Sequence, residues 1–207
     1  MPYARDERHA LVETMRTAGP DAPTLCGDWT ARDLAAHLVI RERRLDASPG
    51  ILVPALSGYT DRVQRGQARK DWSALLGEVA SGPPVWSPFR WIDEQANLAE
   101  MFIHHEDVRR AGGDWSVRTL PDGMQDRLWT VAKGIGRRSY RRSPVTVVLE
   151  RPDGERATVK SAGDATVVLR GEPAELLLHA FGRDEVRIEF DGAAPDVATI
   201  TALDRSV

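Results

Sequence analysis

A carboxylate and an imidazole stand four residues apart in this 207-residue chain, at Glu100 and His104. The surrounding sequence, 92–111, is predicted to form a helix, and side chains at this spacing lie one above the other on one helical face. Such a pair can converge on one divalent metal ion, although a solvated, salt-bridged helix face is the alternative. A catalytic zinc site usually takes three protein ligands, so a third must come from another element.

His37 is the best candidate for that third ligand. It lies in a helix predicted to begin after Trp29, with Thr30 as N-cap and Asp33 completing something close to a capping box. Asp33 precedes His37 by four residues, so it can accept the second ring N–H or serve only as part of the cap. His37 from one helix with Glu100 and His104 from another would form a His2Glu set with one open coordination position.

The other three histidines have weaker claims. His9 falls among charged residues and His179 beside leucines, as is typical of surface and core histidines. His105 points about 100° away from His104 around the helix. We expect it to support the site or the fold, with replacement of His104 as the ligand as the alternative.

The periodicity of the chain changes near residue 143. Residues 1–142 are predicted to be helical, with helices at 5–18, after Trp29, at 71–80, at 92–111 and after residue 122, and a looser stretch at 51–70. Residues 143–207 alternate with period two, with a hairpin turn at 152–155, a short helix at 174–181 and a last strand at 186–190. The sequence therefore predicts an α+β chain, with an N-terminal four-helix bundle at 1–142 and a small α+β domain at 143–207.

The charge and cysteine content of the chain limit the kinds of partner and of metal ligand that we expect. The 28 basic and 31 acidic residues are interspersed and give a net charge of −3, which favours neither nucleic acid nor a membrane surface as a partner. The charged N-terminal residues indicate a cytoplasmic protein. Cys26 is the single cysteine, so the metal is expected to be held by histidine and carboxylates. We expect a buried, inert thiol there, and no protein cysteine at the metal site.

Three segments resemble a known family. They are WTARDLAAHL at 29–38, NLAEMFIHHEDVRR at 97–110, and GEPAELLL at 171–178 with Phe181-Gly182-Arg183. Together they resemble the actinobacterial branch of the DinB-like metal-binding superfamily, which includes mycothiol-dependent maleylpyruvate isomerase. The second histidine, His105, departs from the single histidine usual in those isomerases and indicates a distinct subfamily.

The resemblance implies roles for particular residues. His37, Glu100 and His104 would bind a divalent metal, with zinc as the expected ion. Asp107 stands where the isomerases have an acidic residue near the site and would move a proton or orient a donor. Arg183 matches an arginine that reaches the active cleft from the second domain and would hold a substrate carboxylate.

The sequence thus predicts a zinc-dependent, maleylpyruvate isomerase-like enzyme, an isomerase or transferase in which a metal-activated thiolate attacks a small electrophile. Mycothiol is the expected thiol cosubstrate, so the predicted partners are a small molecule and a low-molecular-weight thiol. Two alternatives stay open: a hydrolase that uses zinc-bound water, and a non-catalytic protein in which the ion only ties two helices together.

Overall fold

The structure, a computed structural model, describes residues 2–44, 46–47, 53, 57–87, 90 and 94–205. The chain divides into two compact units, Met1–Trp115 and Ser116–Val207. In the described residues the first unit is helical, and the second joins three helices to a four-stranded sheet. The predicted α+β class, with a helical N-terminal region and a small C-terminal sheet, is confirmed.

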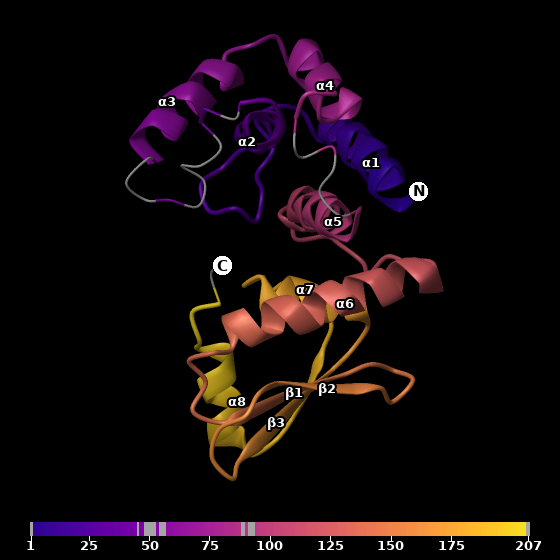
Figure 1. Cartoon of the computed structure of the whole chain (residues 1–207), viewed down its shortest axis with the longest axis vertical. Helices are drawn as coiled ribbons and strands as arrows, with labels where there is room; N and C mark the ends of the chain where they lie inside the picture. Colours follow the sequence, from indigo (N-terminus) through magenta and orange to yellow (C-terminus); the bar gives the residue numbers. More distant parts are fainter. Residues whose placement is uncertain are drawn as a thin grey trace. The chain divides into compact units, whose positions relative to one another are not determined.

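The described part of the first unit contains five helices, α1 (Pro2–Ala18), α2 (Ala31–Arg43), α3 (Ser57–Ala68), α4 (Trp72–Ser81) and α5 (Glu94–Arg110). Helix α1 packs against α4 and α5, and α2 packs against α3 and α4 (Figure 1). Buried leucines, valines and methionines of α1, α2, α4 and α5 form the core, including Leu11, Met15, Leu34, Leu38 and Met101. This packing holds α2 and α5, the two helices with the predicted metal ligands.

The start of α2 follows the predicted signal. Asp33 N–H donates to Thr30 Oγ1 at 3.4 Å, and Asp33 Oδ2 accepts from Thr30 N–H at 3.1 Å, which is a complete capping box. The cap fixes the first turn of the helix. His37, one turn further on, is thereby given a defined position.

The sequence predicts a looser stretch at 51–70, whereas helix α3 forms within it. Its sequence has two glycines, Gly58 and Gly66, and few apolar residues, so local propensity for helix is low. Packing against α2 compensates for this weakness. The predicted start of the later helix at 92 lies outside the described residues, within which α5 begins at Glu94.

The second unit consists of α6 (Asp122–Ser139), β1 (Thr146–Glu150), β2 (Arg156–Lys160), β3 (Thr166–Arg170), α7 (Pro173–Ala180), β4 (Glu189–Asp191) and α8 (Ala194–Thr201). The sheet order is β2-β1-β3-β4; β1 pairs antiparallel with β2 through the predicted hairpin and parallel with β3, and β4 runs antiparallel to β3. Helix α8 has no counterpart in the sequence analysis, because its β-branched residues gave no clear helical signal.

The sequence analysis places α6 in the helical domain at 1–142, whereas in the structure α6 lies within the second unit. It packs against α7 and β2, and Figure 1 shows α6 and α7 on the same side of the sheet. Helix α6 can lie close to β2 because Gly136 has no side chain. A Cβ added at Gly136 would lie 3.0 Å from Cγ1 of Val159 in β2. No helix in the described part of the chain is long and apolar enough to cross a membrane.

Candidate metal centre

The three predicted metal ligands lie together in the first unit. Oε1 of Glu100 is 3.3 Å from Nε2 of His104, one turn later on α5, and 3.8 Å from Nε2 of His37 on α2. The donor atoms of the three side chains all lie within 4.8 Å of one another. Local helical spacing brings Glu100 to His104, and the packing of α2 near α5 adds His37.

These distances suit a tetrahedral ion. Two ligands bound to zinc at about 2.0–2.1 Å in a tetrahedral arrangement are separated by about 3.3 Å. The separation of His104 from Glu100 equals this value, and a shift of about half an ångström at His37 would reach it. Nitrogen and oxygen donors of this kind fit a divalent metal such as zinc.

His37 is buried, with 9% of its surface exposed. Its ring packs against Trp29 at a centroid distance of 5.1 Å and against His104 at 5.6 Å. Burial lowers the pKa of His37 against the opposing effect of the Glu100 carboxylate. The ring is therefore neutral at pH 7, which is the form that binds a metal.

Glu100 and His104 form a charge-assisted pair. Burial raises the pKa of Glu100, but hydrogen bonds from His104 and His37 outweigh it and hold the pKa well below its usual range. Burial lowers the pKa of His104, whereas hydrogen bonds to Asp107, Cys26 and Glu100 raise it well above its usual range. Arg41 Nε, 3.3 Å from Glu100 Oε1, also favours the carboxylate. A metal would thus meet an ionised Glu100 and displace a proton from His104.

Asp107 lies on the opposite side of the His104 ring from Glu100. Its Oδ2 is 2.9 Å from Nδ1 of His104, and the residue is fully buried. A carboxylate in this place holds the proton on Nδ1 and leaves Nε2 free for a metal, as outer carboxylates do at many histidine-metal sites. The contact gives the predicted site residue Asp107 an orienting position behind a ligand.

Cys26 is the residue that sequence reasoning missed. We expected no cysteine at the site, but Cys26 Sγ donates to Asp107 Oδ2 at 3.0 Å and lies 3.9 Å from His104 Nδ1. The expectation was wrong because 81 residues separate Cys26 from Asp107, and no local signal reports that contact. The Leu25 N–H donates to the Asp107 carbonyl at 3.1 Å, which fixes the loop before α2 against α5.

This contact creates a second set of donors. Cys26, His104 and Asp107 also present ligand atoms within 4.8 Å of one another, on the Nδ1 side of the ring. Within the described residues, His104 is common to both sets. The two sets make different predictions about which side chains a metal requires.

The contacts of Asp33 and His105 decide between the alternative roles that the sequence left open for each residue. Asp33 Oδ2 accepts from the backbone and the hydroxyl of Thr30, so its contacts are those of the capping alternative. His105 Nδ1 lies 2.7 Å from Glu7 Oε1 and its Nε2 lies 2.8 Å from Thr14 Oγ1, both on α1. These bonds give His105 the structural role of joining α5 to α1.

Two histidines have the environments expected of them. His9 is exposed, and His179 is buried in the second unit, where its Nδ1 lies 2.6 Å from the Tyr140 hydroxyl. Burial lowers the pKa of His179 to about 3. His179 is therefore a neutral core histidine at pH 7.

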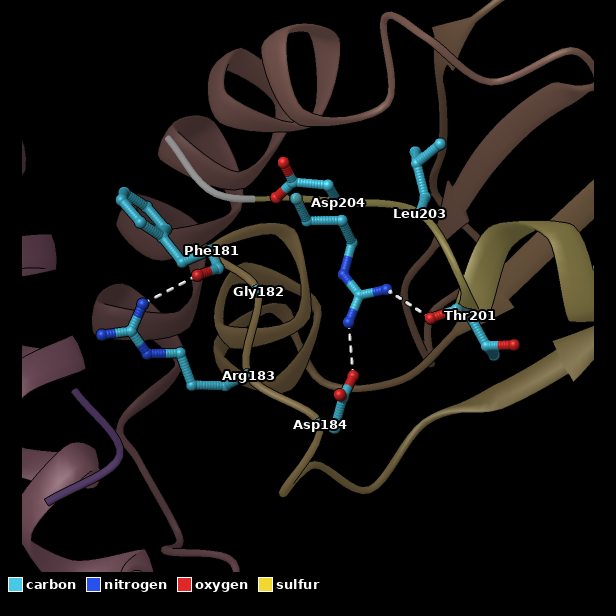
Figure 2. A pocket seen from close by; sticks show the side chains of 8 residues that line it. Phe181, Gly182, Arg183, Asp184, Thr201, Leu203 and Asp204 are labelled. Carbon is cyan, nitrogen blue, oxygen red and sulfur yellow. Dashed lines mark hydrogen bonds and ion pairs between the residues drawn. The ribbon is translucent and has the colours of Figure 1, made fainter. Parts of the chain in front are cut away.

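Arg183 lies in the second unit, beside a cavity of about 430 Å³. Figure 2 shows its guanidinium turned back to the Phe181 carbonyl, which accepts a hydrogen bond from Nη1 at 2.7 Å. Asp184 on the same cavity pairs with the buried Arg205. The predicted role of Arg183 at the metal stays a prediction.

Comparison with known proteins adds one family. Residues 3–50 match the family model described as the mycothiol maleylpyruvate isomerase N-terminal domain. This range contains α1 from its second residue, the loop with Cys26, and α2 with His37, whereas Glu100 and His104 lie beyond it. No curated protein and no solved structure matches the chain. Residues 3–50 are therefore similar to the mycothiol maleylpyruvate isomerase N-terminal domain, in agreement with the DinB-like, mycothiol isomerase-like branch that the sequence resembles.

Proposed function

We propose that this chain is a zinc-dependent enzyme that uses mycothiol or a similar low-molecular-weight thiol to isomerise, or to conjugate with, a small electrophile. The observation that carries the proposal is the convergence of His37 Nε2, Glu100 Oε1 and His104 Nε2 at distances suited to one ion. The family match at residues 3–50 supports mycothiol, or a similar thiol, as the cosubstrate. The proposed site uses three protein ligands, which leaves a coordination position for a thiol sulfur.

Zinc bound there would favour the thiolate form of a coordinated thiol, which is the nucleophilic form. The side chains around the proposed zinc ion would contribute in different ways. Glu100 would supply a negative charge to the ion, and the neutral His37 would supply a nitrogen lone pair. Asp107 accepts a hydrogen bond from Nδ1 of His104 and so aims Nε2 at the ion.

Asp107 and Arg183 have proposed roles of different kinds. Asp107 is fully buried and contacts His104 and Cys26, so its surroundings favour positioning over proton exchange with a substrate. Arg183 has the planar donor pattern that pairs with a carboxylate, and we propose it as the group that binds an acidic substrate. The proposed location of this enzyme is the cytoplasm.

The second donor set, made of Cys26, His104 and Asp107, favours a second candidate function. If a metal used Cys26 and Asp107 together with His104, the chain would be a metal-binding protein whose ion ties the Cys26 loop to α5. The thiolate would satisfy the ion and leave the thiol-exchange position unused. A hydrolase would keep the first set of ligands and activate water in place of a thiol.

The first test is metal content after dialysis against a weak chelator. We expect His37→Ala and Glu100→Ala each to lose stoichiometric zinc, with the exposed His9→Ala as the matched histidine control. Full zinc content in His37→Ala or Glu100→Ala rejects the His2Glu site.

The second test is activity. The zinc-loaded protein is incubated with mycothiol and a panel of unsaturated dicarboxylates and other electrophiles, and the products are analysed by mass spectrometry. Isomerised or thiol-conjugated products that require both zinc and mycothiol support the proposal. Products that form with zinc and no thiol favour the hydrolase, and no product from any substrate favours the metal-binding protein.

A further inference from the structure

A second polar cavity lies in the first unit and shares no lining residue with the candidate metal centre. It has a volume of about 270 Å³ and is lined by the first turns of α1, the end of α4 and two side chains near the start of α5. Its basic lining residues are Arg5, Arg8, His9 and Arg90. We propose that this cavity is a binding site for a small oxyanion, a carboxylate or a phosphate group, held on one edge of Arg8.

Arg8 is a buried and rigidly held cation, with 7% of its surface exposed. Its Nη1 donates to Glu42 Oε2 at 3.0 Å and to the Val79 carbonyl at 3.0 Å, and its Nη2 donates to Glu42 Oε1. Glu42 is itself 1% exposed. These bonds fix the guanidinium plane before any ligand arrives, which reduces the entropy lost on binding.

The bonds to Glu42 and Val79 occupy three of the five N–H donors of Arg8. The two that remain, Nε–H and the second Nη2–H, form the side edge of the guanidinium and have no hydrogen-bond partner among the residues that the structure describes. Two parallel N–H groups of this kind match the two oxygens of a carboxylate or a phosphate. The free edge of a fixed arginine is the central element of the proposed site.

Gly82 leaves one flat face of the Arg8 guanidinium without a side chain against it. It ends α4 with φ +67°, and a Cβ built there would meet Nε of Arg8 at 3.5 Å, Cζ at 3.6 Å and Nη2 at 3.9 Å. Any larger residue would place its side chain against the same face of Arg8. A side chain at this position would therefore stack on the flat face of the guanidinium and narrow the cavity, whereas the two unused donors lie in the guanidinium plane.

The charges that line the cavity favour an anion: Glu42 offsets the charge of Arg8, and the excess positive charge comes from Arg5 and Arg90. Among the described lining residues there is no carboxylate, and the nearest acidic partner of Arg5, Asp6, is 3.9 Å away with both side chains mostly exposed. Exposed pairs of this kind are strongly screened. By contrast, the cavity beside Arg183 contains Asp184 and Asp204 and is balanced in charge. The volume near Arg8 falls below the range typical of drug-sized ligands, so a small oxyanion fits best.

The test is a titration of the full chain with inorganic phosphate at constant ionic strength, followed by isothermal calorimetry, with succinate as the carboxylate arm and chloride as the reference. We expect saturable binding of one phosphate or one succinate in the millimolar range or tighter. The arm with the higher affinity identifies the oxyanion. The absence of saturable binding in both arms overturns the proposal.

Arg8→Lys is the decisive variant, because lysine retains a positive charge for Glu42 and lacks the side edge with two parallel donors. We expect it to weaken binding by roughly tenfold or more. Arg5→Gln and Arg90→Gln alter exposed side chains, so folding is preserved, and each is expected to weaken binding by a few fold; the exposed Arg16→Gln is the matched control. Unchanged affinity in Arg8→Lys and in the double variant Arg5→Gln/Arg90→Gln overturns the site.

Glu100→Ala separates this site from the metal centre, because phosphate can also ligate a bound metal. Oxyanion binding at Arg8 is expected to persist in this variant. Loss of phosphate binding in Glu100→Ala, with binding retained in Arg8→Lys, would place the anion at the metal centre and reject the cavity at Arg8.

Discussion

Asp107 and His104 form a 2.9 Å contact between a fully buried carboxylate and Nδ1 of the imidazole, while Nε2 of the same ring faces Glu100 at 3.3 Å. One histidine thus lies between two carboxylates. The carboxylate on the Nδ1 side sets the tautomer, and the one on the Nε2 side is a proposed fellow ligand. This arrangement makes the functions of the two acidic residues separable by mutation.

Asp107→Asn is expected to weaken zinc binding by about 10–100-fold without removing the site, because the amide no longer provides the charged acceptor that orients His104. Competition with a chromophoric chelator measures the affinity. Asp28→Asn, an exposed carboxylate in the loop before α2, is the matched control and should bind as the wild type does. An unchanged affinity in Asp107→Asn would contradict the orienting role.

Cys26→Ser discriminates between the two donor sets. A serine hydroxyl can still donate to Asp107, so we expect zinc stoichiometry and affinity to match those of the wild type when the ion is held by His37, Glu100 and His104. Zinc content after dialysis is the measurement. If Cys26→Ser loses zinc while His37→Ala keeps it, the ion lies on the Cys26 side of the ring.

His105→Leu should reduce stability and leave the metal in place. The change removes the imidazole bonded to the buried Glu7 and to Thr14, and loss of such a buried partner costs about 1–3 kcal/mol. Urea unfolding followed by circular dichroism gives the loss in unfolding free energy. The exposed His9→Gln should change little, and loss of zinc in His105→Leu would show that His105 acts at the site.

His179 is expected to make the second unit sensitive to acid. Its folded-state pKa of about 3 lies below the ordinary value of 6.5, so the unfolded chain binds the proton first and stability falls as the pH drops below about 6.5. Between pH 7 and pH 5 this effect amounts to about 2 kcal/mol.

His179→Gln removes the titrating group and should flatten this part of the pH dependence, measured as urea midpoints at both pH values. The mutation also alters the contact with Tyr140, so absolute stability at pH 7 will fall. The difference between the two pH values is therefore the informative quantity. An equal acid-induced loss in His179→Gln would remove His179 as the cause.

Features set by short-range spacing were predictable. The four-residue interval from Glu100 to His104 becomes a shared helical face in any helix, and the Thr30 and Asp33 signal produced the capping box that begins α2. The hairpin between β1 and β2 followed from alternation around a turn sequence. The mixed helical and sheet organisation could be derived from these local patterns alone.

The tertiary structure decided which distant residues meet. It placed Cys26 against Asp107 across 81 residues and His105 against Glu7 across 98, and it added α3 through packing on α2. No periodicity in the sequence encodes such contacts, because they depend on how α1, α2 and α5 pack around a common core. The sequence by itself determined α2 and α5 and the types of donor that they carry; only the packing of the helices and of the loop before α2 decided that His104 would have a donor set on each side of its ring.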